Sequence, residues 1–333
     1  MADQVDEQPQ QAIAIDWEEE SALGDDAASE TATLRSSIYN YVYENGRRYH
    51  SFRQGAYWGP NDEEAQDNLD LFHHIFALSL GGRLHLAPLD NPQRVLDIGT
   101  GTGIWAIEFG DTYPSAHVIA TDLSPIQPDL VPPNVEFQID DFTEEWTFKP
   151  SSFDFIHARS LYGCVADYQA LYAEVLKALK PGAWFEQAEI SVVPKSDDGS
   201  IDGTYLEQWG KLAIECGEKF GKSFAIAEDS EHEFRKAGFE NIEYKTFKWP
   251  IGTWPKDPMY KTIGAYNRMG WEDGIEGWAM FLFTNYLKWQ KEEVQVLIAG
   301  IRKNLRDPNL HGWQNISICY GQKPMNPAPT QES

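Results

Sequence analysis

The stretch Val95-Leu96-Asp97-Ile98-Gly99-Thr100-Gly101-Thr102-Gly103-Ile104-Trp105 decides the fold. A short apolar strand runs into a turn with glycine at every second position, and the residues after the turn have the pattern of a helix. Glycines at this spacing let the backbone approach a ligand closely and take φ values that other residues resist. The turn matches neither the GxGxxG of dinucleotide-binding folds nor the GxxxxGK[ST] of phosphate loops, so phosphoryl transfer from ATP is disfavoured. A glycine-rich turn that binds no ligand is the alternative.

An acidic residue ends the next predicted strand, HVIATD. This residue, Asp122, follows Asp97 by 25 positions. A carboxylate there can accept two hydrogen bonds from a ribose diol, a geometry that neutral side chains match poorly. Alternatively, Asp122 is the N-cap of a helix before Ser124-Pro125. Folds that bind NAD share such an aspartate, so Asp122 alone does not identify the cofactor.

A second acidic segment, Asp140-Asp141-Phe142, follows the strand VEFQI. A carboxylate at this place can accept a hydrogen bond from an adenine amino group, and the following backbone N–H can donate to the ring. Paired acids can also bind a metal ion. Neither a histidine nor a further acidic cluster lies nearby in the sequence to complete a ligand set, so no metal is expected.

Strands and helices alternate between Pro92 and Ile190. The predicted order is RVLDIG, helix GIWAIEFGDTY, HVIATDL, VEFQIDD, FDFIHARS, helix YQALYAEVLKALKPG and AWFEQAEI. This alternation predicts an α/β fold with a doubly wound sheet. Right-handed crossovers then place the ligand outside the carboxyl ends of the strands.

The chain after the predicted sheet segment reads as mainly helical. Helices are predicted over 204–220, 228–237, 257–269, 275–289 and 291–305, and strands at FENIEYKTFKW and HGWQNISICYG. Eight of the 12 tryptophans lie at or after Trp184. Most are expected in the core, and several are candidates to line a pocket for an aromatic or amphipathic substrate.

The N-terminal part divides into a tail and an arm. Residues 1–33 hold ten acidic residues and no Lys or Arg, which predicts a disordered acidic tail. Residues 34–91 are expected to form a helical arm, with one helix ending near Asn45-Gly46 and a second running from a cap at Asn61 or Asp62 to Gly81-Gly82. Residues 92–323 form the main domain, and 324–333 are a Pro-rich disordered end.

Composition excludes several classes of protein. The 333 residues include 52 acidic and 27 basic side chains, a net charge of −25. Such a surface repels phosphate backbones, so no nucleic-acid partner is expected. The chain lacks a stretch of ~18 apolar residues for a membrane span, and its start lacks a secretory signal. Three separated cysteines (Cys164, Cys216, Cys319) without a CxxC pair indicate reduced thiols. The expected location is cytoplasmic, with the nucleus as an alternative.

The order strand-Asp-GxGxG, strand-Asp, strand-Asp-Asp, FDFIHAR and LKPGAWFEQAE resembles class I S-adenosylmethionine (SAM)-dependent methyltransferases over about residues 92–190. The flanks SSIYNYVYENGRRYHSFRQGAYWGPNDEEAQDNLDLFHH and FKWPIGTWPKDPMYKTIGAYN resemble the fungal LaeA-like methyltransferases of secondary metabolism. The resemblance implies a mostly parallel, seven-stranded Rossmann-like sheet and a helical lid over about 204–306. Two departures are Asn68, where the family usually has a basic residue, and Ala183, where a second glycine is common.

The resemblance also assigns cofactor contacts. Asp97, Gly99, Gly101 and Gly103 would hold the methionine end of SAM, and Asp122 the ribose. Asp141 and the Phe142 backbone would hold the adenine. Tyr57 would cap the cofactor from the arm, and Arg159 and Trp105 would border the site.

Methyl transfer from a sulfonium is an in-line displacement, which depends mainly on alignment and exclusion of water. A base is needed only where the nucleophile carries a proton. The catalytic candidates are His157, Glu189 and Tyr57. Further candidates for the base are His50 and Glu186. Alternatively, His157 is a hydrogen-bonded histidine of the core, and Glu189 has a structural role.

Two functions remain open. The first is a SAM-dependent methyltransferase acting on a small molecule, expected to be a secondary metabolite. The second is a regulatory protein of the same fold that acts through a protein partner, with the acidic tail as a docking arm. An NAD-linked oxidoreductase does not fit the GxGxG spacing.

Overall fold

The computed structural model describes residues 41–325. The predicted acidic tail, residues 1–33, lies outside this range, as do residues 326–333 of the predicted C-terminal end. In the described part of the chain, none of the helices is long and apolar enough to cross a bilayer. Residues 41–325 also contain no group of three or more His, Cys, Asp or Glu placed to hold a metal ion.

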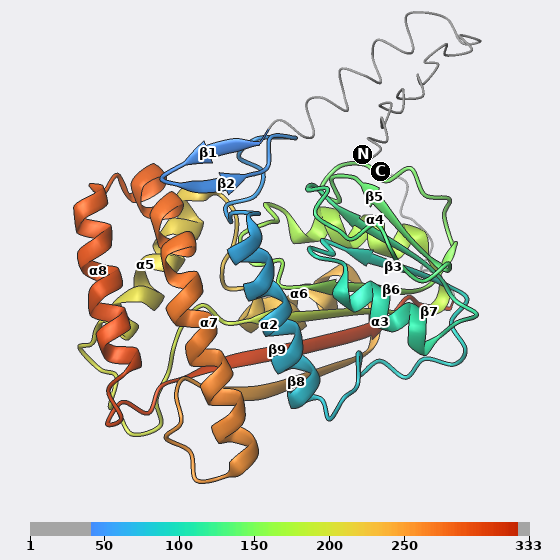
Figure 1. Ribbon diagram of the computed structural model, residues 1–333. Coiled ribbons are helices and arrows are strands. Elements are labelled where there is room, and N and C mark those ends of the chain that lie inside the picture. The colour runs from blue at the N-terminus through green and yellow to red at the C-terminus, as the bar shows by residue number, and fades with distance from the viewer. Residues whose placement is uncertain (1–40, 326–333) are drawn as a thin grey trace, which may run out of the picture. The chain divides into compact units, whose positions relative to one another are not determined.

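A seven-stranded sheet forms the centre of the fold (Figure 1). The strand order is β5-β4-β3-β6-β7-β9-β8, and β9 runs antiparallel to both its neighbours while the other pairs are parallel. The strands are β3 (Arg94–Ile98), β4 (His117–Asp122), β5 (Val135–Ile139), β6 (Phe153–Arg159), β7 (Leu179–Ile190), β8 (Glu240–Pro250) and β9 (Trp313–Gln322). The predicted doubly wound, mostly parallel sheet is confirmed.

Helices cover both faces of the sheet. They are α2 (Glu63–Ser79), α3 (Ile104–Thr112), α4 (Tyr168–Ala178), α5 (Tyr205–Phe220), α6 (Ile226–Ala237), α7 (Pro258–Leu282), a π-helical turn η1 (Phe283–Leu287) and α8 (Lys291–Leu305). Alternate residues of β3 face opposite sides: Leu96 and Ile98 pack with α4 and α6, and Val95 packs with α2 and α3. This period of two is what a strand covered on both faces requires.

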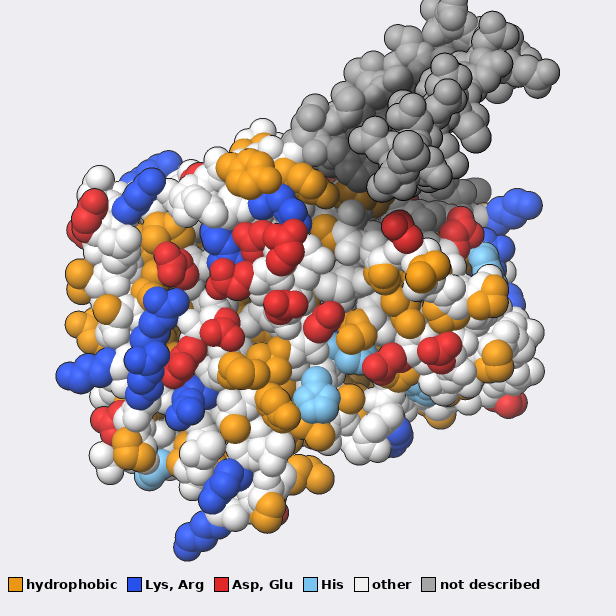
Figure 2. All heavy atoms as spheres, in the orientation of Figure 1, with side chains coloured by type: hydrophobic (Ala, Val, Ile, Leu, Met, Phe, Trp, Pro, Cys, Tyr) orange, Lys and Arg blue, Asp and Glu red, His pale blue; other side chains and the backbone are white. Residues whose placement is uncertain are grey.

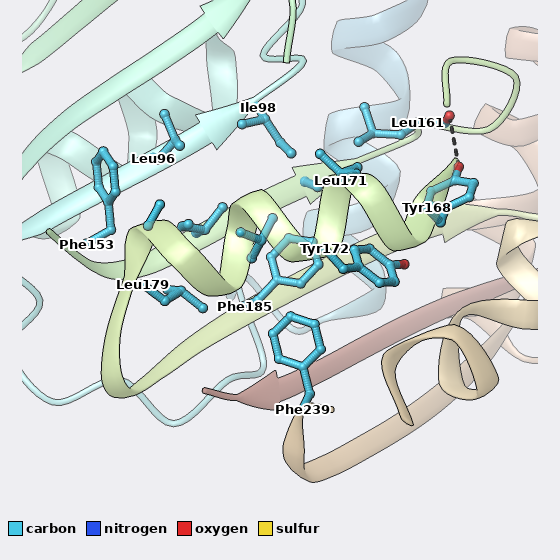
Figure 3. Close-up of a cluster of buried hydrophobic side chains, with 14 of the residues drawn as sticks. Leu96, Ile98, Phe153, Leu161, Tyr168, Leu171, Tyr172, Leu179, Phe185 and Phe239 are labelled. Atoms are coloured by element: carbon cyan, nitrogen blue, oxygen red, sulfur yellow. Dashed lines mark hydrogen bonds between the residues drawn. The ribbon is translucent and has the colours of Figure 1, made fainter. Parts of the chain in front are cut away.

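The core between the sheet and α4 anchors a loop that borders the site. Figure 3 shows Tyr172 of α4 beside Phe185 of the sheet, and the two ring centroids are 5.7 Å apart. The Tyr168 hydroxyl donates to the Leu161 carbonyl at 3.2 Å. Tight packing on α4 therefore fixes the start of the segment that follows β6.

A separate apolar cluster joins the helices predicted as a lid. Side chains of α5, α7, η1 and α8 form it, and α7 also packs along α2. The lid prediction needs one correction, because α6 packs on β7, β8 and β9 and belongs to the sheet layer. The apolar face of α6, with Phe234 stacked on Phe185, explains that placement.

One helix, α7, replaces the two predicted over 257–269 and 275–289. Gly270 and Gly274 lie in the interval between the two predicted helices, and the structure continues the helix through both. A Cβ at Gly270 would lie 3.0 Å from the Phe72 ring of α2, so glycine lets the two helices approach. Burial along the helix therefore outweighs the helix-breaking tendency of these residues.

The first predicted helix of the arm is wrong. Residues Val42–Glu44 (β1) and Arg47–Tyr49 (β2) form a two-stranded antiparallel hairpin. Asn45 and Gly46 both have positive φ, 53° and 82°, as a type I′ hairpin turn requires. The Asn-Gly pair therefore marks a hairpin and not a helix end. The second predicted helix, α2, is confirmed, with Asp62 as its N-cap.

Candidate functional site

Two adjoining cavities open at the carboxyl ends of β3, β4 and β6. The first, here called the α7 cavity, measures about 90 Å³ and lies between the glycine turn, α2 and α7. The second, the β4 cavity, measures about 100 Å³ and lies between the ends of β4 and β5 and the segment after β6. They share the walls Tyr57, Pro60, Leu69, Gly99, Gly101, Arg159 and Ser160. A single elongated molecule can therefore occupy both.

Two glycines of the turn form the floor shared by the cavities. Gly99 and Gly101 have φ values of +67° and +60°, which disfavour other residues. A Cβ on Gly99 would lie 2.7 Å from Leu161 Cδ2, so this close approach also needs glycine. The prediction for these two positions is consistent with the geometry.

Gly103 does not line either cavity. It precedes α3 with φ +82°, and a Cβ there would lie 2.3 Å from the Phe137 ring of β5. The predicted cofactor contact at Gly103 is therefore not supported, because the residue is needed for packing between α3 and β5. Sequence spacing alone cannot separate these two demands on a glycine.

Asp97 and His157 form a buried pair at the α7 cavity. His157 Nδ1 lies 2.7 Å from Asp97 Oδ1, and the Thr100 hydroxyl donates to Asp97 Oδ2 at 2.6 Å. The indole of Trp105 lies flat on the imidazole, with 3.7 Å between ring centroids. Burial lowers the pKa of His157 and exceeds the opposing effect of Asp97. A neutral ring with Nδ1–H toward Asp97 satisfies this arrangement.

Asp122 lies in the β4 cavity, where its two carboxylate oxygens are oriented by backbone groups. Oδ2 accepts from Gly101 N at 2.8 Å, and Oδ1 accepts from Ser124 N at 2.9 Å. Burial raises its pKa to about 6 in spite of these hydrogen bonds. A carboxylate oxygen can accept more than one hydrogen bond, so Asp122 keeps the capacity to accept from a diol.

Asp141 and Phe142 line the other end of the β4 cavity. Asp141 Oδ1 accepts from the Thr143 backbone and hydroxyl at 3.0 and 2.6 Å, which fixes the carboxylate. Oδ2 lies 3.4 Å from Arg53 Nε. The acidic segment is therefore held in place by its own turn and by the arm, as a contact to a flat heterocycle would need.

Arg159 borders both cavities, as predicted. Its guanidinium lies 5.1 Å from the centre of the Phe76 ring, and Nη2 lies 3.1 Å from His73 Nδ1. In the part of the chain that the structure describes, Arg159 makes no ion pair with a carboxylate. Burial lowers its pKa to about 10, so it stays charged near neutral pH. Such a cation can bind an anionic group of a ligand.

Tyr57 lines both cavities from the arm, which agrees with the predicted cap. Gly59 gives the phenol room, because a Cβ there would lie 2.6 Å from Tyr57 Oη. Burial raises the pKa of Tyr57 well above its usual range. The phenol therefore stays protonated near neutral pH, and the predicted role as a catalytic base does not fit.

Glu189 lines neither cavity. Its carboxylate accepts from Leu161 N and Tyr162 N at 3.1 and 3.2 Å and from Gln187 Nε2 at 2.7 Å. Burial raises its pKa to about 7. The structure thus corrects the predicted catalytic role of Glu189: it orients the segment that forms the cavity wall after β6. Glu186 likewise accepts from two backbone N–H groups, those of Leu86 and Ala87.

The resemblance implied a helical lid over about 204–306, but it did not identify which residues of α2 and α7 line the α7 cavity. Glu64 and Phe72 of α2 and Asp273 and Trp278 of α7 line the α7 cavity. Figure 2 shows acidic side chains gathered over the N-terminal end of α2. The sequence feature that could have indicated this wall is the concentration of tryptophans in the C-terminal half. The tertiary contact of α7 with α2 selects Trp278 among those tryptophans.

The sequence is similar to known proteins over most of its length. The profile of a family described as methyltransferase domain matches residues 71–244. Methyltransferase pytC of Aspergillus terreus is 39% identical over 321 residues, covering 95% of this chain and 98% of that protein. Protein-methionine methyltransferase laeA of Emericella nidulans is 35% identical over 85% of this chain and 76% of that protein. Secondary metabolism regulator LAE1 of Cochliobolus heterostrophus is 35% identical over 86% of this chain and 95% of that protein.

Among solved structures, phosphoethanolamine N-methyltransferase 2 of Haemonchus contortus in complex with phosphomonomethylethanolamine and S-adenosylhomocysteine aligns with a TM-score of 0.48. It shares 18% identity, with coverage of 91% of this chain and 75% of that one.

Proposed function

This chain belongs to the SAM-dependent methyltransferase family, in its LaeA-like branch, and we propose that it transfers the methyl group to a small molecule held in the α7 cavity. The observation that carries the proposal is the convergence of Asp97, Asp122 and Asp141, from the ends of three neighbouring strands, on two joined cavities. Three strands that end at one edge of the sheet can bind a ligand along its length.

The residues present fit the cofactor. Asp122 would hold the ribose diol, and Asp141 with the Phe142 backbone would hold the adenine at the far end of the β4 cavity. Gly99 and Gly101 line both cavities and would lie along the chain that joins the two ends of the cofactor. Arg159 would bind the carboxylate of the methionine part, and Tyr57 would cover the cofactor from the arm.

When bound, SAM supplies an electrophilic methyl group on a positively charged sulfur. The chain contributes orientation and exclusion of water. Trp58, Phe72, Tyr162 and Trp278 wall the α7 cavity with aromatic rings. An acceptor placed between these rings is held in one orientation with little water around it, and orientation alone can lower a barrier by about 7–11 kcal/mol in favourable systems.

His157 is the proposed base for an acceptor that carries a proton. Asp97 holds its Nδ1, so the neutral ring presents Nε2 as the proton acceptor. Its lowered pKa keeps the imidazole neutral and able to take a proton near neutral pH. An acceptor already ionised, or a thioether, would need no base, and substitution of His157 would then leave turnover unchanged.

The direct test is binding and turnover by the full chain. Calorimetry should show S-adenosylhomocysteine bound with a stoichiometry of one, and Asp122→Ala should weaken that binding. Turnover should then appear on a panel of hydroxylated and amine-bearing aromatic molecules. Full-strength binding of the cofactor product by the Asp122→Ala variant would contradict the ribose assignment.

The names of several relatives support a second candidate, a regulator of secondary metabolism that acts through a protein partner. Methyltransferase pytC is named for enzymatic activity alone, and its higher identity and nearly full coverage favour the enzyme. A pull-down with the full chain, and with a form lacking residues 1–33, separates the two: a stoichiometric partner lost with those residues fits the regulator. A nuclear fluorescent fusion would fit it as well, and a cytoplasmic one the enzyme.

A further inference from the structure

Arg159, at the end of β6, lines both cavities and has an uncharged hydrogen-bond partner. Within residues 41–325, none of the carboxylates lies at ion-pair distance from its guanidinium. Burial lowers the pKa of Arg159 to about 10, so the group stays charged near neutral pH. A charge removed from water is usually paired with an opposite charge, because burying it alone is costly. The partner that the chain supplies here is a histidine of α2.

His73 of α2 holds one end of this guanidinium. Arg159 Nη2 lies 3.1 Å from His73 Nδ1. A guanidinium carries only donors, so Nδ1 is the acceptor, and the neutral ring carries its proton on Nε2. Phe76 lies about one turn further along α2, on the same face, and the centre of its ring is 5.1 Å from the guanidinium. Two side chains of one helix face therefore fix the position of Arg159.

Glu108 of α3 lies at the opposite ring nitrogen of His73. Its Oε2 is 3.0 Å from His73 Nε2, and the His73 side chain is only 4% exposed. A carboxylate at this place favours the tautomer with the proton on Nε2, which leaves the lone pair of Nδ1 for Arg159. Burial, followed by the charge of Arg159, lowers the pKa of His73, so the ring is neutral near neutral pH.

The neutral partner leaves the charge of Arg159 available to a ligand. A carboxylate in the place of His73 would neutralise the guanidinium and compete with an anionic ligand group. The lone pair of an imidazole orients the guanidinium without cancelling its charge. A guanidinium has five N–H donors, and the bond to His73 uses one of them, so others remain for a carboxylate in the cavities.

We propose that His73 is a positioning residue for methyl transfer, which directs the Arg159 guanidinium toward the carboxylate of the methionine part of SAM. Glu108 supports this orientation because it keeps the proton of His73 on Nε2. This inference rests on the proposed function, which assigns that carboxylate to Arg159. Because His73 acts through Arg159, its effect should be confined to ligands that carry the carboxylate.

The test compares the binding of two ligands to the full chain by calorimetry. S-adenosylhomocysteine carries the amino acid carboxylate, whereas 5′-methylthioadenosine keeps the adenine, ribose and sulfur and lacks the carboxylate. His73→Leu removes the acceptor for Arg159. His73→Asn keeps an acceptor near the same place, since the amide oxygen and Nδ1 of histidine are both bonded to Cγ. His74→Leu, at the next and exposed position of α2, is the matched control.

We expect His73→Leu to bind S-adenosylhomocysteine about fivefold more weakly, as for the loss of one hydrogen bond, and 5′-methylthioadenosine with unchanged affinity. His73→Asn should recover most of this loss, and His74→Leu should bind both ligands as the native protein does. Arg159→Gln should weaken binding of S-adenosylhomocysteine alone. Adding His73→Leu to Arg159→Gln should then cause no further loss, because the two residues act as a unit.

Equal weakening of both ligands in His73→Leu would assign His73 a general structural role and overturn the proposal. An unchanged affinity for S-adenosylhomocysteine, or additive losses in the double variant, would overturn it as well. A native protein that binds neither ligand, or an Arg159→Gln variant with native affinity for S-adenosylhomocysteine, would instead contradict the proposed function.

A second variant keeps the test decisive where His73→Leu does not fold. Glu108→Ala changes a carboxylate that is 46% exposed, and Asp111→Ala, also exposed on α3, is its control. Glu108→Ala should weaken binding of S-adenosylhomocysteine about twofold and leave 5′-methylthioadenosine unaffected. Removal of a negative charge near Arg159 would by itself strengthen binding of an anion, so an unchanged or higher affinity would contradict the orienting role.

Discussion

His157 Nδ1 lies 2.7 Å from Asp97 Oδ1, because the two residues are paired in register on the neighbouring parallel strands β6 and β3. Both are nearly fully buried, at 2% and 3% exposure. Asp97 also accepts a hydrogen bond from Thr100 in the glycine turn. One carboxylate therefore links β3 and β6 to the turn that forms the floor of both cavities. The pair therefore stabilises the site whether or not His157 also moves a proton.

Asp97→Asn should destabilise the fold. The amide can accept at only one of its two ends, so either His157 or Thr100 loses an acceptor in a buried place. Loss of a hydrogen bond to a charged group costs about 1.5–3 kcal/mol in free energy of unfolding. Urea denaturation measures this change, with Asp111→Asn, at an exposed position of α3, as the control. Equal midpoints for the two variants would contradict the structural role of the pair.

Asp122→Ala should raise the dissociation constant for S-adenosylhomocysteine at least about fivefold, since it removes the acceptor for a diol. Calorimetry at fixed protein concentration gives the value. The control is Asp129→Ala, at an exposed carboxylate in the loop beyond β4. The two variants should differ in affinity and agree in stoichiometry.

Cofactor affinity should also depend on pH through Asp122. Burial raises its pKa to about 6, so about half of the Asp122 carboxylates are protonated at that pH, and protonation removes an acceptor that a diol needs. Affinity is then expected to be constant above about pH 7 and to fall as the pH drops toward about 5. Titrations across this interval check the trend, and the Asp122→Ala variant should not show it.

Glu189→Gln should change how stability depends on pH. Burial raises the pKa of Glu189 from 4.5 in the unfolded chain to about 7, so the folded state favours the protonated form. Its stabilising contribution is present at low pH and is lost as the pH rises through about 7. The native protein should therefore lose stability relative to Glu189→Gln between about pH 5 and about pH 8. Parallel curves of unfolding free energy for the two proteins would disprove this.

The sheet could be predicted because the sequence features that indicate it lie close together in the chain. Strand periodicity, the glycine turn and the acidic strand ends lie in one continuous stretch, and a doubly wound sheet brings such ends to one edge. For this reason Asp122, Asp141 and Gly99 lie at the carboxyl edge of the sheet, as predicted. The pairing of His157 with Asp97 also follows from both lying near the ends of strands that turn out to be neighbours.

Other parts of the site depend on contacts between distant segments. Asn45-Gly46 can end a helix or turn a hairpin, and only the pairing of β1 with β2 decides between them. Trp278 reaches the α7 cavity because α7 packs along α2, a contact between segments about two hundred positions apart. Glu189 was expected in the site from its strand position, yet its three hydrogen-bond donors hold it in the wall.

Gly103→Ala tests the reassignment of this glycine from ligand contact to packing. A Cβ there would combine a φ of +82° with an approach of 2.3 Å to the Phe137 ring, so the fold must shift. Gly81→Ala is the matched control, because Gly81 has φ +63° and no atom within 4 Å of the added Cβ. The control should lose about 1–2 kcal/mol of unfolding free energy from backbone strain alone, and Gly103→Ala should lose about 1–3 kcal/mol more from overpacking. The folded fraction of Gly103→Ala should still bind S-adenosylhomocysteine with native affinity. A variant of native stability with weakened binding would restore Gly103 to the cofactor site.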